Sequence, residues 1–142
     1  MTPSTAPKYA VWHDSPAYDS SGPGPRVFVA GGEVRGSSTE SVGLSAEAFL
    51  ASSDIDVAFL GVDGVDAVAG CTNYDPVGAR VNAALFRRAR RRVVLADATK
   101  IGRVTLAPVC RLSEVDVLIT DSRAAEPAVE AIRRLGCRVV RV

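Results

Sequence analysis

The stretch Val57-Ala-Phe-Leu-Gly-Val-Asp-Gly-Val-Asp66 decides the fold class of this chain. It begins with a short run of apolar, branched and aromatic side chains, which is typical of a strand buried on both faces. The run stops at Gly61, and a loop rich in glycine and aspartate continues to Tyr74. A buried strand that ends at a polar loop indicates a mostly parallel sheet with helices on its faces.

Further apolar runs and helical patterns flank this strand. Asp75 followed by Pro76 indicates a helix start, because the carboxylate can accept a backbone N–H and proline lacks the N–H that would go unpaired. Gly136 is a typical helix end. The predicted order is an α/β fold, a three-layer sandwich around a mostly parallel sheet. We predict strands at 26–30, 57–61, 93–96, 117–120 and 138–142, helices at 41–52, 75–90 and 126–135, and an irregular link between the third and fourth strands.

Composition favours one domain that does not hold DNA by itself. The chain has 142 residues, of which 47% are hydrophobic, enough for a buried core. Residues 1–25, rich in proline, serine and glycine, are predicted to form an arm or tail, and residues 26–142 the domain. The 17 basic and 16 acidic residues give a net charge of +1, whereas a DNA-binding domain usually has a clear basic excess.

The sequence lacks the common cofactor and metal motifs. Neither GxGxxG nor GxxxxGK[ST] is present, which argues against dinucleotide and nucleoside triphosphate binding of those types. Cys71, Cys110 and Cys137 lie far apart without zinc-ligand spacing, so we interpret them as small buried residues in a reducing compartment. With no signal peptide and no apolar run of 18 residues, we expect a cytoplasmic protein without cofactor or metal.

Polar residues gather after the predicted strands, where parallel α/β sheets bind their ligands. These strand ends carry Gly31-Gly32, the 61–74 loop, residues 97–102 and Thr120-Asp121. At the first of them, Gly31 and Gly32 could point N–H groups at an anion that Arg35 also contacts. The alternative is a turn that needs a positive φ.

The loop from Gly61 to Tyr74 combines two carboxylates, three glycines and two hydroxyl or amide groups, those of Thr72 and Asn73. Such groups can exchange hydrogen bonds with the hydroxyls of a sugar. Carboxylates could equally act as general bases, bind a metal, or bond only to nearby backbone N–H groups in turns. The candidate residues are Asp63, Gly64, Asp66, Gly70 and Thr72.

Lys100 is one of only two lysines and follows the third buried strand. Its ammonium could meet a phosphate as a point charge, and the alternative is an ordinary solvated lysine.

Taken in order, these segments resemble the effector-sensing domain of DeoR-type bacterial transcriptional repressors. The resemblance covers about residues 26–142 and depends on the order and spacing of several motifs. They are Ala30-Gly-Gly-Glu-Val-Arg35, Ser41-Val-Gly43, Val57 to Asp66 with Gly70 and Thr72, Val94 to Lys100 with Gly102, Leu112 to Asp121, and Gly136 to Val142.

The resemblance implies a fold shared with ribose-5-phosphate isomerase and CoA transferases, and a phosphorylated sugar or related metabolite as ligand. It implies that Lys100 faces the anionic end of the ligand and Asp63 a sugar hydroxyl. In the family the domain belongs to an oligomer whose DNA affinity changes when the ligand binds. Partners are therefore the metabolite, further copies or a partner regulator subunit, and DNA only indirectly.

The chain departs from the family pattern in three respects. No winged helix-turn-helix precedes Arg26, and the first sensor strand with its Gly-Thr-Thr type loop has no counterpart. We expect a truncated paralogue, a fragment of a longer product, or a domain completed by a partner. The related isomerases have acidic residues where this chain has Leu60 and Gly64, so we predict a non-enzymatic sensing domain. The alternatives are an oligomerisation or interaction remnant that senses nothing and, third, a phosphosugar enzyme.

Overall fold

The computed structural model describes residues 10–11, 27–35 and 40–142. Of the predicted arm at residues 1–25, only Ala10 and Val11 lie within the described residues. They form a two-residue strand, β1, where no regular element was expected.

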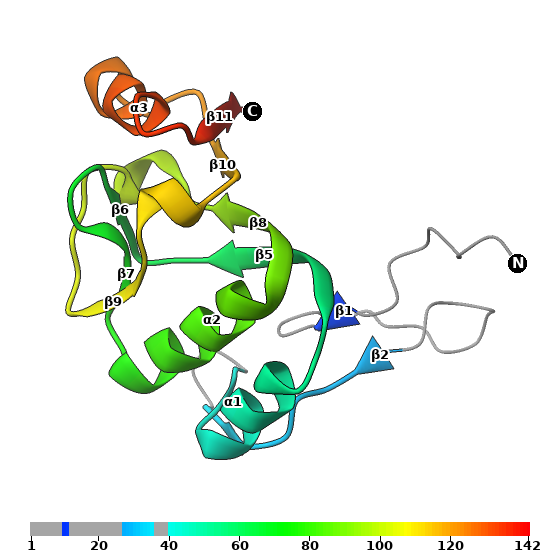
Figure 1. The fold of residues 1–142 in the computed structure, drawn as a ribbon. Coiled ribbons are helices and arrows are strands. Elements are labelled where there is room, and N and C mark those ends of the chain that lie inside the picture. The colour runs from blue at the N-terminus through cyan, green and yellow to red at the C-terminus, as the bar shows by residue number, and fades with distance from the viewer. Residues whose placement is uncertain (1–9, 12–26, 36–39) are drawn as a thin grey trace, which may run out of the picture.

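Four parallel strands form the centre of the fold (Figure 1). Their order in the sheet is β11-β10-β8-β5, and every neighbouring pair is parallel. The predicted α/β class with a mostly parallel sheet is therefore confirmed. The strands are β5 (Ile55–Gly61), β8 (Ala89–Leu95), β10 (Val117–Thr120) and β11 (Arg138–Arg141).

Three helices accompany the sheet, as predicted, but the first is shorter than 41–52 because residues 41–42 form a strand, and the second ends before β8 begins at Ala89. In Figure 1, α1 and α2 lie side by side, and α3 lies next to β11 at the other end of the molecule. Asp75 caps α2 by accepting the Gly78 N–H at 2.5 Å, with Pro76 in the first turn. The helices are α1 (Leu44–Ala51), α2 (Pro76–Arg88) and α3 (Glu126–Arg133).

The segments predicted as a loop and an irregular link contain a second sheet. Its three antiparallel strands have the order β6-β7-β9. The hairpin of β6 and β7 was not predicted, because its sequence contains glycine and aspartate, which are depleted in strands in general. Here glycine is used where backbones approach closely. The elements are β6 (Gly64–Asp66), β7 (Gly70–Asn73), the short helix η1 (Ala98–Lys100), β9 (Ala107–Cys110) and the short helix η2 (Leu112–Glu114).

The prediction of a buried strand at residues 26–30 was wrong in its placement. Only β2 (Val27–Phe28) is a strand, and it pairs with β1 instead of joining the four-stranded sheet. Val29 is 68% exposed. An apolar run predicts a buried strand only where neighbours cover both faces, and here Ala30 is buried while Val29 is exposed. A small hairpin of β3 (Glu33–Val34) and β4 (Ser41–Val42) follows.

The core lies between the parallel sheet, α2 and the antiparallel sheet. Leu60, Val94 and Leu118 are buried on the central strands, and they belong to one apolar cluster with Val65 and Ile132. Among the helices of the described segments, none has the length and apolar character needed to cross a bilayer.

Leu118→Ala should destabilise the protein strongly, because Leu118 is completely buried at the centre of the sheet. We expect a loss of about 2–5 kcal/mol in the free energy of unfolding, measured in urea, from lost burial and the cavity left behind. Leu106→Ala is the matched control, since Leu106 is 75% exposed, and its effect should stay within about 0.5 kcal/mol. Equal losses in the two variants would contradict this core.

Candidate functional site

Three aspartates follow paired strand ends at the carboxyl edge of the parallel sheet. Leu95 pairs with Gly61 of β5 on one side and with Ile119 of β10 on the other. Each of these paired residues is followed two positions later by an aspartate. Because neighbouring strands lie about 4.8 Å apart, paired positions carry the three carboxylates to the same edge. We call Asp63, Asp97 and Asp121 the aspartate row.

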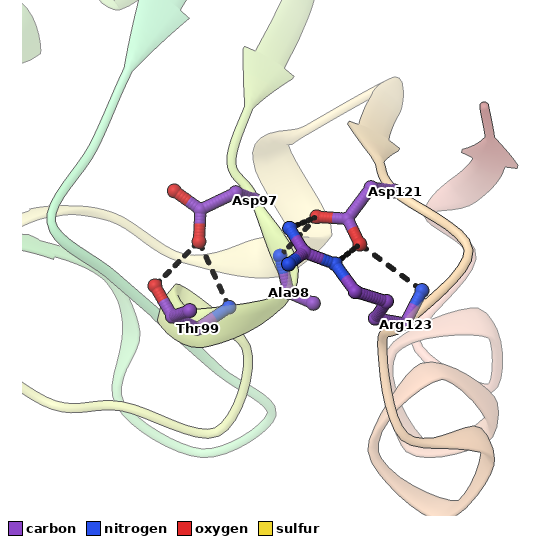
Figure 2. A network of polar contacts seen from close by, with 5 residues as sticks. All are labelled: Asp97, Ala98, Thr99, Asp121 and Arg123. Atoms are coloured by element: carbon purple, nitrogen blue, oxygen red, sulfur yellow. Dashed lines mark hydrogen bonds and ion pairs between the residues drawn. The ribbon is translucent and has the colours of Figure 1, made fainter.

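Asp121 is held by a network of hydrogen bonds (Figure 2). One of its carboxylate oxygens accepts the Ala98 N–H at 2.7 Å, and the other accepts the backbone N–H and Nε of Arg123 at 3.0 and 2.9 Å. These bonds, above all those from the Arg123 side chain, hold the pKa of Asp121 well below its usual range. The network links the loop after β8 to the loop after β10, because Ala98 and Asp121 belong to different loops.

Asp97 caps the short helix η1 in the neighbouring loop (Figure 2). It accepts the Thr99 N–H at 2.8 Å and also the Thr99 hydroxyl. The hydrogen bonds from Thr99 lower the pKa of Asp97, and the nearby charge of Lys100 adds to this effect. Asp97 is therefore a carboxylate at neutral pH.

Asp63 is positioned by the end of β7. One of its carboxylate oxygens accepts the Tyr74 N–H at 2.9 Å. Its own backbone N–H donates to the Thr72 carbonyl at 3.0 Å and lies 3.3 Å from the Asn73 side-chain oxygen. Asp63 thus stands between the end of β5 and the segment that enters α2.

The loop that carries Lys100 is fixed against the hairpin of β6. The Gly102 N–H donates to the Val65 carbonyl at 2.7 Å, and Val65 forms a parallel bridge with Ile101. Lys100 itself is half-buried, and its charge acts on Asp97. Lys100 therefore lies in the same loop as Asp97 of the aspartate row, and its contact with a ligand stays a prediction.

Arg35 lies beside the start of α2 with two carboxylate partners. Its guanidinium contacts Asp75 at 2.9 Å and Glu40 at 2.6 Å. The hydrogen bond with Glu40 is the largest cause that raises the pKa of Arg35, and the charges of Asp75 and Asp63 also contribute. Arg35 is thus close enough to Asp63 for their charges to interact, although its hydrogen bonds go to other acids.

Local contacts account for several other residues predicted to bind a ligand. One Asp66 carboxylate oxygen accepts the N–H groups of Val68 and Ala69, both at 2.8 Å, which is the turn chemistry weighed as an alternative. Buried Thr72 accepts the Thr105 N–H at 2.9 Å through its hydroxyl oxygen. For Asp66 and Thr72, ligand contact remains a prediction.

Several positions of the site require glycine, for different structural reasons. A side chain at Gly64 or Gly70 would overlap backbone of another segment, the Arg103 carbonyl in one case and the Cys110 carbonyl in the other. Gly70 also has a φ of +78°, and Gly32 one of +137° against the Val42 carbonyl. Gly31, in contrast, has open space around its α-carbon. Anion binding by Gly31 and Gly32 stays a prediction.

Asp97, Asp121 and Arg123 complete the site but were not among the predicted ligand residues. Asp97 and Asp121 each follow a predicted strand, and that position was the available signal. Within the described residues, no group of three or more His, Cys, Asp or Glu side chains could hold a metal ion, so the aspartate row is not such a group.

Comparison with known proteins identifies the family. The family of DeoR C-terminal sensor domains matches residues 20–122. The chain belongs to this family. The match confirms the resemblance drawn from the motifs up to residue 122, and all three residues of the aspartate row lie inside it.

Several relatives carry the names of transcriptional regulators. The sensor domain is 32% identical over 114 residues to the HTH-type transcriptional regulator GlpR of Haloferax volcanii, an alignment of 80% of this chain and 45% of that protein. It is 29% identical over 119 residues to a putative aga operon transcriptional repressor of Escherichia coli, covering 84% and 44%. It is 27% identical over 97 residues to the glycerol-3-phosphate regulon repressor of Escherichia coli, covering 68% and 38%. The chain thus spans less than half the length of these relatives.

Gly70→Ala should destabilise the sensor domain by at least about 2 kcal/mol. The substitution combines a positive φ with overlap of the Cys110 carbonyl, and each effect costs on the order of 1–3 kcal/mol. Gly31→Ala is the control, because its surroundings are open and its φ lies outside the left-handed region. Urea unfolding of both variants measures the difference, and a Gly70→Ala variant as stable as Gly31→Ala would contradict the close approach of β7 and β9.

Asp121→Asn should change how stability depends on pH. The pKa of Asp121 is lowered in the folded sensor domain relative to an unfolded value of about 3.9, so folding favours its ionised form. That stabilisation is present above about pH 4 and is lost as the pH falls through the lower folded value. The variant should be less stable than the parent at pH 7 and should lose less stability between pH 5 and pH 2.

Urea unfolding at pH 7, 5, 3 and 2 measures both effects. Asp56→Asn serves as the control, because Asp56 is exposed and forms an ion pair with Arg90 at 3.5 Å. If acid destabilises Asp121→Asn as steeply as the parent, the network around Asp121 does not act as described.

Proposed function

We propose that this chain is the metabolite-sensing part of a DeoR-family transcriptional regulator and that it binds a phosphorylated sugar or a related metabolite. The proposal rests on one observation above all, the aspartate row beside Lys100 at the carboxyl edge of the parallel sheet. Ligands of parallel α/β proteins bind at this edge. Carboxylates there can accept hydrogen bonds from hydroxyl groups, while the lysine attracts an anionic group.

The names of the relatives support the class of ligand. One relative is a repressor of a glycerol-3-phosphate regulon, and glycerol 3-phosphate carries both hydroxyls and a phosphate. In the proposed assignment Lys100 meets the phosphate and Asp63 a hydroxyl. Gly31, Gly32, Arg35, Gly64, Asp66, Gly70 and Thr72 complete the proposed ligand-binding region, several of them by shaping its backbone.

The output of sensing would be a population shift. A ligand that touches the loops after β5 and β8 would favour the arrangement in which these loops are closest together. A ligand changes an equilibrium only through unequal affinity for the two arrangements. In the complete regulator this shift would alter DNA binding by a helix-turn-helix in the same protein or in a partner subunit. The protein would act in the cytoplasm, as an oligomer.

The proposed domain is not an enzyme. A general acid or base works best with a pKa near the working pH. The pKa values of Asp97 and Asp121 are shifted downward, away from neutrality, by hydrogen bonds within the fold. Such carboxylates suit constant hydrogen-bond acceptance better than proton transfer.

A second candidate function is oligomerisation or partner binding without a metabolite. The observation that favours it is Phe59, which is 63% exposed on β5, the edge strand of the four-stranded sheet. Val57 and Leu95 are also exposed nearby on β5 and its neighbour β8. An edge strand with exposed apolar side chains can pair with another chain.

A ligand screen separates the two candidates. A panel of sugar phosphates with glycerol 3-phosphate and inorganic phosphate is tested by thermal shift, since a ligand that binds only the folded state raises the Tm. We expect at least one sugar phosphate to raise the Tm more than inorganic phosphate does. If no compound raises the Tm and light scattering shows a stable dimer, the second candidate replaces the first.

Calorimetry with the best ligand then tests the two assigned residues. Lys100→Ala and Asp63→Ala should each weaken binding by about tenfold or more, the effect of losing a charge-assisted hydrogen bond worth about 1.5–3 kcal/mol. The matched controls are Arg90→Ala and Asp56→Ala, which remove the same charges from an exposed pair 3.5 Å apart near the amino ends of β8 and β5. Parent-like affinity in Lys100→Ala and Asp63→Ala would refute the site.

A further inference from the structure

Two cysteines separated by 38 residues of sequence face each other across the antiparallel sheet. Cys71 on β7 pairs in register with Cys110 at the end of β9. Directly opposed residues of antiparallel strands have α-carbons about 4.5 or 5.5 Å apart and side chains on the same face. Both separations lie within the range that a disulfide spans. The register alone therefore permits a bond between these two sulfurs.

The contacts around the pair bring the two thiols together. All three cysteines are free, and the Cys71 and Cys110 thiols each shift the pKa of the other. The absence of a side chain at Gly70 lets β7 approach the Cys110 carbonyl closely. A shift of the register between Cys71 and Thr72 interrupts the regular ladder next to the pair.

The two thiols differ in exposure and in acidity. Cys71 is fully buried in the core, and its pKa is raised far above the usual value by the hydrogen bond with Cys110 and by burial. Cys110 is only partly buried, and its pKa is lowered by the same hydrogen bond and by the charge of Arg92. Cys110 is therefore the better nucleophile and Cys71 the better second thiol.

Cys137 is the third cysteine and has a different environment. It is buried, its pKa is raised to about 11 by burial, and its thiol donates to the Arg138 carbonyl at 3.8 Å. It lies in the segment between α3 and β11, outside the register that joins the other two. Cys137 thus serves as an internal control.

We propose that Cys71 and Cys110 form a reversible oxidation site that hydrogen peroxide converts to a disulfide. The Cys110 thiolate attacks one peroxide oxygen, the O–O bond breaks, and hydroxide leaves and takes up a proton, which gives Cys110 sulfenic acid. The Cys71 sulfur then attacks the Cys110 sulfur, the S–O bond breaks, and water leaves with the Cys71 proton. Two thiols and one peroxide become one disulfide and two waters, so the peroxide is reduced and the sulfurs are oxidised.

The disulfide would tie together the two segments that frame the proposed ligand edge. β7 leads directly to Tyr74, whose N–H holds Asp63, and β9 follows the loop that carries Lys100. Thr105 in that loop already donates its N–H to Thr72 on β7. The oxidation site stands without the proposed ligand, because it depends only on the pairing of β7 and β9.

Thiol counting by mass spectrometry tests the proposal. The purified protein is treated with hydrogen peroxide, unfolded, and alkylated with N-ethylmaleimide. Since the chain has three cysteines, we expect three adducts before treatment and one after it, with three restored by dithiothreitol. Peptide mapping should show the link between Cys71 and Cys110 and the single adduct on Cys137.

Single substitutions provide the matched controls. Cys137→Ala should still lose two reactive thiols, whereas Cys71→Ala should form no intramolecular disulfide and should leave a Cys110 sulfenic acid that dimedone traps. Three adducts on the treated parent protein, a link that includes Cys137, or only disulfide-linked dimers would each overturn the proposal. Mapping of the parent protein decides the question even where a variant fails to fold.

Discussion

Val94 pairs with Leu60 of β5 on one side and with Leu118 of β10 on the other, and all three side chains are buried. This row sets the register of the parallel sheet, because a slip of one residue would turn the apolar side chains of a strand to its other face. The next row, formed by Gly61, Leu95 and Ile119, then has a fixed position. The aspartate row two residues further on follows from the same register, so the core and the candidate site share one constraint.

The antiparallel sheet attaches the ligand-edge loops to that core. The carbonyl of buried Val65 accepts the Gly102 N–H, and the hydroxyl of buried Thr72 accepts the Thr105 N–H. Both bonds satisfy backbone groups of the loop that carries Lys100, which has little regular structure of its own. Glycine at position 64 allows this approach, because any side chain there would overlap the Arg103 carbonyl. The loop is therefore positioned by the hairpin more than by its own sequence.

Local signals in the sequence predicted the elements whose neighbours are close in the chain. The strand at 117–120 has the predicted bounds, and Asp75 and Pro76 correctly marked the start of α2. The hairpin of β6 and β7 was missed, because its glycines serve tertiary contacts that appear only once Arg103 and Cys110 are in place. The apolar run at 26–30 was misplaced for a related reason, since its partner β1 lies outside the main sheet.

The site was harder to predict than the fold, because its contacts join distant segments. Residue types drew attention to Asp63 and Lys100, whose ligand contacts stay predictions, and the position after a strand pointed to residues 97–102 and 120–121. The pairing of Arg35 with Asp75, 40 positions further on, left no local signal. The pairing of Cys71 with Cys110 also could not be predicted, because it depends on the register of β7 and β9, and neither strand was predicted.

The proposed function requires an acidic edge to accept an anionic ligand, and the charges around the aspartate row bear on this requirement. Each aspartate has a cation near it, since Arg123 bonds to Asp121, Lys100 acts on Asp97, and the charge of Arg35 is coupled to that of Asp63. Arg123 forms an ion pair with Asp121, and Arg35 forms ion pairs with Glu40 and Asp75. Lys100 comes from the loop between the aspartate row and the hairpin of β6 and β7. A ligand with one phosphate and several hydroxyls would therefore find one place for its anionic group and acceptors for its hydroxyls along the row. A charged ligand without hydroxyls would donate no hydrogen bonds to the carboxylates and would bind this edge more weakly.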